Sequence, residues 1–319
     1  MVRFNTPGSN KSMQLDYDFV HPQKLTAFYE CDIYRVYAKG AKNPFYETRD
    51  RSTIYYETLK ALYENVDPND PWDFIKNISG IRVRGYVGEL KKTEAPFINH
   101  ITCEISILNS PYFLIDDNWY KVRGDFIKAI NDQCSTMIKI NEWSSHPLTT
   151  PWPLDEMDEG EYNLQYINTE GFIVMDKILG QHIELCDLLY ESDDKIYLIH
   201  VKEGFDAKIR DLTNQVSISS NRLWNDLKSD SKFLTEVFER LLKSGNLKQS
   251  ISKDEFLKKF EKEIIYVIAF CHKKNNKKVS ENIEDFKSNI AKFSIIQSMR
   301  EMQSNSYPLK TIEIKASIK

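Results

Sequence analysis

Three residues in two neighbouring segments have types and a spacing that could serve phosphodiester hydrolysis. Asp187 ends the segment IELCD, and His200 and Lys202 stand 13 and 15 residues later in LIHVKEG, a separation that suits two strands joined by a four-residue turn. Because side chains alternate along a strand, His200 and Lys202 share a face while Val201 points into the core. Hydrolysis of a phosphodiester uses a divalent cation to neutralise phosphoryl charge and activate water. A lysine beside the cation can orient or deprotonate that water.

The elements that must position these residues form a recognisable pattern. The segment at 264–271 is apolar throughout, which indicates a buried central strand. A hairpin followed by alternating helices and strands predicts an α/β protein whose mixed sheet carries helices on both faces. The predicted strands are 172–179, 183–190, 196–202, 264–271 and 309–315, and the predicted helices are 161–170, 208–227, 232–247 and 283–302.

This order of elements resembles the core of the PD-(D/E)XK nuclease superfamily, a restriction-endonuclease-like fold. In that resemblance, Asp187 matches the carboxylate of the second strand, and residues 200–202 (HVK) match the (D/E)-x-K triplet of the third. The resemblance implies a metal-dependent nuclease in which Asp187 binds the cation and Lys202 acts on the water. It further implies a glutamate from the preceding helix, which Glu161 would supply, and a polar residue facing the substrate, which Gln215 would supply.

The chain departs from that pattern at His200, which stands where the superfamily has an acid. Imidazole suits Mn²⁺ or Zn²⁺ better than Mg²⁺ and removes one negative charge. Glu184 compensates only if its strand is bulged, because otherwise it faces away from Asp187. We therefore expect Mg²⁺ or Mn²⁺ as cofactor, with Asp187, Glu161, Glu184 and His200 as ligands. Each residue also has a structural interpretation: a hydrogen-bonded His200, or an ordinary ion pair between Asp187 and Lys202.

A second resemblance is to the "sporadically distributed" bacterial protein family, a domain of unknown function. It rests on ITCEISILNSPYFLIDDNWYKV, EGEYN, IELCDLLYESDDKIYLIHVK and EIIYVIAFC, and it runs from about residue 100 onwards. Where that family reads close to SHLFAQG on the helix after the triplet, this chain reads RDLTNQV. Gln215 fits the pattern, while Arg210 and Asp211 replace the serine–histidine pair, so Arg210 joins Gln215 as an expected substrate-binding residue. The resemblance implies a role in phage defence or in a mobile element and names no reaction.

The N-terminal half has a mixed, aromatic-rich composition that predicts a separate α+β domain. Strands are expected at 33–37, 81–87, 100–108 and 112–122, and helices at 52–65 and 125–134. The stretch 141–160 holds three prolines and has no periodicity, which is typical of a linker. We therefore expect domains at 1–150, for recognition or interaction, and 151–319, for the nuclease-type core.

Composition narrows the class of protein further. No apolar run approaches the roughly 20 residues that span a bilayer, and the N-terminus lacks the apolar segment of a secretory signal. The five scattered cysteines form no C-x-x-C pair, so reduced thiols and a cytoplasmic location are expected. A formal charge of −4 argues against non-specific coating of nucleic acid.

The sequence supports three functions from different classes. The first is a metal-dependent nucleic-acid hydrolase, for which DNA is expected as substrate ahead of RNA. The second is a catalytically inactive nucleic-acid-binding or sensor module that keeps the nuclease fold. The third is an interaction subunit that binds a protein partner or forms a homodimer.

Overall fold

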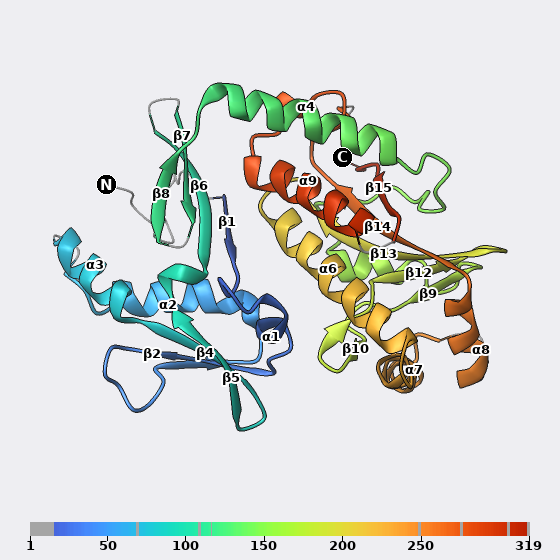
Figure 1. Cartoon of the computed structure of the whole chain (residues 1–319), viewed down its shortest axis with the longest axis horizontal. Coiled ribbons are helices and arrows are strands. Elements are labelled where there is room, and N and C mark those ends of the chain that lie inside the picture. The colour runs from blue at the N-terminus through green and yellow to red at the C-terminus, as the bar shows by residue number, and fades with distance from the viewer. Residues whose placement is uncertain are drawn as a thin grey trace. The chain divides into compact units, whose positions relative to one another are not determined.

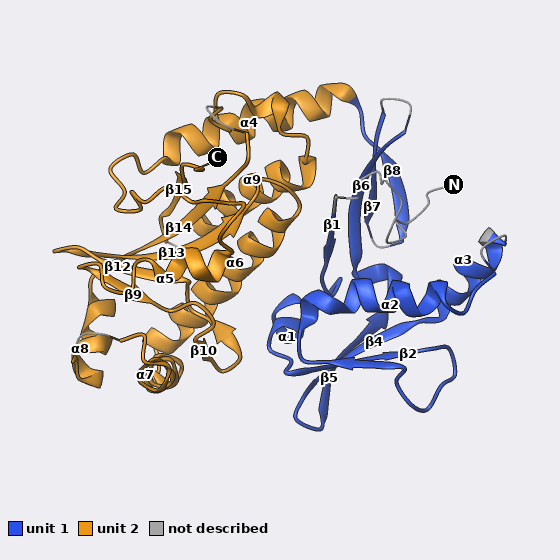
Figure 2. Ribbon diagram, turned by 180° about the vertical axis from the view of Figure 1, so that it is seen from behind, with its two compact units in different colours: residues 1–123 blue, residues 124–319 orange. Residues whose placement is uncertain are grey.

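The computed structural model describes residues 16–67, 70–107, 110–115, 117–247, 250–274, 277–304 and 307–317. Their contacts divide the chain between Arg123 and Gly124 into two units, shown in different colours in Figure 2. Both units combine helices and strands (Figure 1), so the expectation of a mixed α/β chain is confirmed.

Unit 1 contains two antiparallel four-stranded sheets. One has the strand order β1-β6-β7-β8 and the other β3-β2-β4-β5. The strands are β1 (Asp16–Phe19), β2 (Ile33–Tyr37), β3 (Tyr46–Thr48), β4 (Arg82–Val87), β5 (Leu90–Pro96), β6 (Ile101–Ile107), β7 (Ser110–Ile115) and β8 (Asn118–Lys121). The helices are α1 (Leu25–Tyr29), α2 (Ile54–Tyr63) and α3 (Pro71–Gly80), and 3-10 turns cover Arg51–Thr53 and Ile98–His100.

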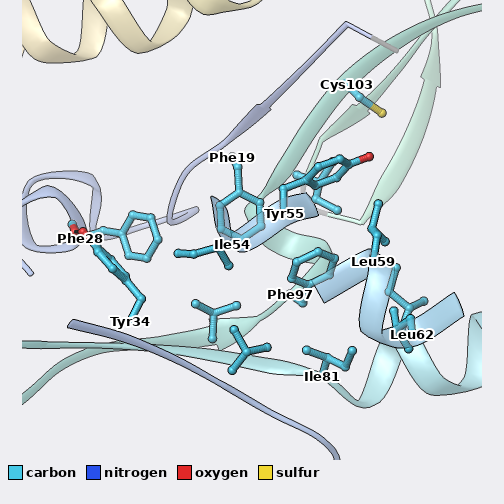
Figure 3. Packing of buried hydrophobic residues seen from close by; sticks show 14 of the residues in the cluster. Phe19, Phe28, Tyr34, Ile54, Tyr55, Leu59, Leu62, Ile81, Phe97 and Cys103 are labelled. Atoms are coloured by element: carbon cyan, nitrogen blue, oxygen red, sulfur yellow. Dashed lines mark hydrogen bonds between the residues drawn. The ribbon is translucent and has the colours of Figure 1, made fainter. Parts of the chain in front are cut away.

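The core of unit 1 forms around α2. Its buried residues Ile54, Leu59 and Leu62 recur at the spacing of one helix face, which turns them towards the sheets. Figure 3 shows these side chains packed with Phe97 and with residues from both sheets. One cluster therefore ties the two sheets and α2 into a single unit.

Unit 2 is built on a five-stranded sheet with the order β15-β14-β13-β12-β9. Strands β13, β14 and β15 run parallel, whereas β12 is antiparallel to both β13 and β9, so the sheet is mixed. The strands of this sheet are β9 (Phe172–Val174), β12 (Leu188–Glu191), β13 (Lys195–Glu203), β14 (Glu263–Cys271) and β15 (Leu309–Glu313), and β10 (Leu179–Gly180) and β11 (Ile183–Glu184) form a separate two-stranded sheet. The helices are α4 (Gly124–Asn141), α5 (Glu159–Leu164), α6 (Lys208–Leu227), α7 (Lys232–Ser244), α8 (Lys253–Lys258) and α9 (Asn289–Ser304), and 3-10 turns cover Lys259–Glu261 and Ile283–Asp285.

Helices cover both faces of this sheet. On one face α6 and α9 lie side by side, as Figure 1 shows, and α6 packs on β13 and β14. On the other face, Trp152 and Tyr162 pack against the apolar side chains of β13 and β14. Strand β14 is buried from Ile264 to Cys271 between β13 and β15, which confirms the expected central position.

The predicted linker is attached to unit 2 by a few buried side chains and by backbone hydrogen bonds. The Trp143 amide donates to the Thr311 carbonyl, and the Trp152 amide donates to the Lys315 carbonyl. Trp152 is fully buried and stacks on Tyr162. The expected boundary near residue 150 is therefore displaced to Arg123, because tryptophans and backbone hydrogen bonds, rather than periodicity, hold this proline-containing segment to the sheet.

Several predicted strands are shorter than expected. The expected strand at 183–190 forms only as β11 and β12, and residues 185–187 lie between the two strands, although the Asp187 amide still donates to the Ile199 carbonyl and the Asp187 carbonyl accepts from the Met175 amide. The expected strand at 112–122 reverses at Asp117, whose φ of +64° is a conformation that aspartate tolerates. Of the expected strand at 100–108, Leu108 lies outside the described residues. The expected helix at 161–170 begins earlier and ends at Leu164.

Among the residues described, no helix is both long enough and apolar enough to cross a membrane.

Candidate metal centre

Three carboxylates converge at the end of the β12–β13 hairpin that lies away from its turn. Asp176 follows β9, Glu184 ends β11, and Asp187 precedes β12. One carboxylate oxygen from each lies within 4.8 Å of one from both of the others. Asp187 is buried, and the other two are half-buried. Of these three residues, Glu184 and Asp187 were predicted from the sequence, and Asp176 was not.

The break between β11 and β12 is what brings Glu184 to Asp187. In an unbroken strand, residues three apart would face opposite sides of the sheet. Here β11 pairs with β10, whereas β12 pairs with β9 and β13, so the chain changes partners between the two carboxylates. The sequence predicted that Glu184 could join Asp187 only if its strand were irregular, and this break is such an irregularity.

Backbone amides orient two of the three carboxylates. The Val201 amide donates to Asp187 Oδ2 over 2.6 Å, and the Lys177 amide donates to Glu184 Oε1 over 2.5 Å. Lys177 has a φ of +62°, so a left-handed turn directly after Asp176 presents its amide to Glu184. These bonds fix the direction of the carboxylates without supplying a positive charge.

Full ionisation of these carboxyl groups would leave the site with excess negative charge, and the site opposes it. Burial raises the pKa of Glu184 to about 8, and the charges of Asp176 and Glu159 add to this effect. Burial also raises the pKa of Asp187 well above its usual range, with the charge of Glu184 as the next cause. A bound cation would offset this repulsion, because opposite charge favours the ionised form of a carboxylate.

Lys202 lies beside the carboxylates and is held by Glu159 of α5. Its Nζ is 3.0 Å from Glu159 Oε1, and Glu159 Oε2 accepts from the Glu203 amide. Burial lowers the pKa of Lys202, but the charges of Glu159, Asp211 and Asp187 outweigh it, so the net shift is upward. Lys202 is therefore an ammonium group at neutral pH, suited to stabilising negative charge rather than to acting as a base.

One face of α5 is turned to this centre. Glu159, Gly160 and Asn163 lie within one turn of each other and share that face. A Cβ on Gly160 would lie 3.2 Å from Asp176 Oδ2, so glycine allows the close approach of helix and carboxylate. Asn163 is fully buried, and its Nδ2 donates to Asp176 Oδ1 over 3.5 Å.

The donor set fits a hard divalent cation. Asn163 Oδ1 is buried and has no hydrogen-bond partner among the described residues, whereas Asn163 Nδ2 is the amide atom that faces Asp176. Carboxylate and amide oxygens are the ligands that Mg²⁺ and Mn²⁺ accept, and the group contains neither sulfur nor imidazole. The residues present therefore fit Mg²⁺ or Mn²⁺ better than Zn²⁺.

Two residues expected as metal ligands have other surroundings. Glu161 is exposed, and with Asp158 it forms the capping box that begins α5: the Glu161 amide donates to Asp158, and Glu161 Oε2 accepts from the Asp158 amide. Two residues from Glu159, it points to another side of the helix. His200 is fully buried, is not part of the carboxylate group, and has its ring parallel to Tyr266 with centroids 6.2 Å apart. Burial lowers its pKa to about 3, so the ring is neutral.

The two residues expected to bind substrate lie on α6. Arg210 and Gln215 are both half-buried, and neither joins the carboxylate group. Asp211 follows Arg210 in the first turn of α6, and its negative charge helps to raise the pKa of Lys202. The first turn of α6 therefore contributes to the electrostatics of the centre.

The residues that the sequence analysis missed carry weak signals. Asp176 directly follows the apolar run FIVM, so it is an acid at the end of a buried strand. Asp158 and Glu161 have the spacing of a capping box, which assigns Glu161 to the helix end and leaves Glu159 for the site. Asn163 gives no signal in the sequence beyond its place on the same helix.

Comparison with known proteins identifies a family but no activity. No curated protein and no solved structure gives a significant match to the chain. Residues 26–313 match DUF6119, a family of unknown function, and this match spans both structural units. The chain therefore belongs to the DUF6119 family.

Proposed function

We propose that this protein is a metal-dependent hydrolase of nucleic-acid phosphodiesters, acting on DNA rather than RNA. The observation that carries the proposal is the convergence of Asp176, Glu184 and Asp187 beside the charged Lys202. In this proposal the three carboxylates hold Mg²⁺ or Mn²⁺. When bound, the ion would neutralise phosphoryl charge and lower the pKa of water.

The remaining chemistry belongs to the side chains. The Lys202 ammonium would stabilise the negative charge that develops on the phosphoryl oxygens. Glu159 holds that ammonium through a 3.0 Å contact, which limits the reorganisation needed at the moment of reaction. Asp187, fixed by the Val201 amide, would keep its ligand oxygen in one position.

The order of elements supports a restriction-endonuclease-like fold as part of the proposal. Helix α5 is followed by the meander β9, β12 and β13, by α6, and then by β14 parallel to β13. This is the succession on which the sequence resemblance rests. A setting in phage defence or in a mobile element belongs to the same proposal.

The decisive variant is Lys202→Ala, because the lysine is proposed to act on the transition state rather than in the core. Purified protein would be incubated with Mg²⁺ or Mn²⁺ and labelled single- and double-stranded DNA and RNA. We expect wild-type cleavage of DNA, and a loss of about 100-fold or more in the variant. Lys195→Ala is the matched control, since Lys195 lies on the same strand and pairs with Glu263 at the opposite end.

Cleavage by Lys202→Ala at the wild-type rate would overturn the assigned role of the lysine. A wild-type protein that binds the cation and nucleic acid but cleaves nothing would favour the second candidate, an inactive binding or sensor module. One observation supports that candidate: His200 replaces the expected acid and is buried outside the carboxylate group.

A further inference from the structure

We propose that Ser219 of α6 is a positioning residue for the candidate metal centre. It holds the break between β11 and β12 that brings Glu184 and Asp187 together. The inference rests on the proposed function, because it concerns the geometry of the same ligands.

The hydroxyl of Ser219 binds the backbone at the break. Leu185 follows Glu184 directly, and its carbonyl accepts from Ser219 Oγ over 2.6 Å. Both residues are fully buried. A buried carbonyl needs hydrogen-bond partners, and the Ser219 hydroxyl provides a 2.6 Å bond to a carbonyl that also interacts with the His200 ring.

The same hydroxyl is tied to the centre of the sheet. Ser219 Oγ lies 3.2 Å from the hydroxyl oxygen of Tyr266, which is fully buried on β14. The ring of Tyr266 in turn lies parallel to the ring of His200 on β13. The position of the Leu185 carbonyl is therefore linked, through Ser219 and Tyr266, to the two central strands β13 and β14 as well as to α6.

Removal of the Ser219 hydroxyl should weaken cation binding much more than it weakens the fold. Without it, the Leu185 carbonyl gains by turning back towards strand geometry, and strand alternation then carries Glu184 away from Asp187. Groups that orient metal ligands without touching the metal typically contribute 10- to 100-fold to metal affinity. Core packing would change little, since Ser219→Ala removes one oxygen atom.

The test is the affinity for Mn²⁺, measured from the free Mn²⁺ signal in electron paramagnetic resonance. We expect Ser219→Ala to weaken binding by about 10- to 100-fold. Ser220→Ala is the matched control: Ser220 is the next residue, is equally buried, and donates only within α6, to the Ser217 carbonyl. It should bind Mn²⁺ as the wild type does. Ser219→Thr, which restores the hydroxyl, should recover the affinity.

The outcomes separate this inference from the function it rests on. Equal Mn²⁺ affinity in the wild type and in folded Ser219→Ala overturns the role of Ser219 and leaves the metal site standing. A wild type that binds neither Mn²⁺ nor Mg²⁺ overturns the metal site itself. If thermal melting shows that Ser219→Ala is unfolded, Ser219→Cys decides: it fills the position with a slightly larger and much weaker donor, so wild-type affinity there also refutes the inference.

Discussion

The β12–β13 hairpin has carboxylates at both of its ends, and their pKa values are shifted in opposite directions at the two ends. At the turn, Glu191 accepts from the ammonium groups of both Lys259 and Lys262. Burial would raise the pKa of Glu191, but these two lysines outweigh it and lower the pKa. At the other end, Glu184 and Asp187 have raised pKa values.

The difference is one of charge balance rather than of burial alone. Glu191 is balanced by two cations, which is the arrangement of a structural ion pair. At the opposite end four carboxylates share Lys202, and the exposed Lys177 ammonium is 3.9 Å from Asp176. Ionising such a site is destabilising unless a further cation binds. Glu191 can therefore serve as a control for variants of the carboxylates at the opposite end of the hairpin.

The largest change in stability is expected from substitution of His200. It tests whether this residue belongs to the candidate metal centre. His200→Glu restores the acid of the resembling superfamily, but in this structure it places a carboxylate in a fully buried position against Tyr266. We expect a loss of about 3 kcal/mol or more in the free energy of unfolding, measured by urea denaturation. His200→Leu should cost less, because it places an apolar side chain rather than a carboxylate in this buried position. A stable His200→Glu protein with tighter Mn²⁺ binding would place residue 200 in the site after all.

The next effect is the pH dependence of stability in the absence of metal. The pKa of Glu184 is about 8 in the folded state and near its ordinary value of 4.5 in the unfolded chain, so the folded state binds more protons between these values. Stability should therefore fall as pH rises from about 5 to 8, with a slope of up to about 1.4 kcal/mol per pH unit for one group. Urea denaturation in a chelator measures the slope.

Glu184→Gln should flatten that profile, whereas Glu191→Gln at the turn should leave it unchanged. Saturating Mg²⁺ should also flatten it, because the cation favours the ionised carboxylates. A wild-type profile that is flat or rising in chelator would show that the charges at this end are already balanced.

Neutralising one carboxylate at each end should change stability in opposite directions. In chelator, Asp187→Asn relieves repulsion and should raise the free energy of unfolding, by about 1 kcal/mol. Glu191→Gln leaves two lysines without their partner and should lower it by about 1 kcal/mol or less, since the pair is partly exposed. Adding Mn²⁺ should stabilise the wild type and Glu191→Gln but not Asp187→Asn. The same sign for both variants in chelator would contradict the comparison.

The smallest effect separates the two glutamates of α5. Glu161→Ala removes one half of the capping box and should cost roughly 0.5–1 kcal/mol, with Mn²⁺ affinity unchanged. Glu159→Ala, two residues earlier, should weaken Mn²⁺ binding or cleavage because Lys202 loses its partner. Thermal melting and Mn²⁺ titration of both variants measure this. A loss of Mn²⁺ affinity in Glu161→Ala would return Glu161 to the ligand set.

The sequence predicts the regular elements of unit 2 well where one periodic pattern sets them. Helix α6 occupies the expected residues 208–227, and β14 is the expected buried strand, because apolar spacing alone specifies both. The candidate site is only partly predictable. Asp187 and Lys202 follow from strand spacing, but the break that adds Glu184 depends on Ser219, which lies 34 residues further along the chain than Leu185. Contacts of that range leave no local pattern in a sequence.

The attachment of residues 142–152 to residues 311–316 has a consequence for the order of folding. Parallel bridges join Glu142 to Thr311 and Trp152 to Ala316, so the start of unit 2 is completed by a segment more than 160 residues later. During synthesis, unit 1 can assemble its core as soon as residues 1–123 have left the ribosome, whereas the early part of unit 2 must wait for nearly all of the rest. Such long-range closure is slow and exposes apolar surface in the interval. A stalled or truncated chain would consequently present a finished unit 1 joined to an unfolded, chaperone-dependent remainder.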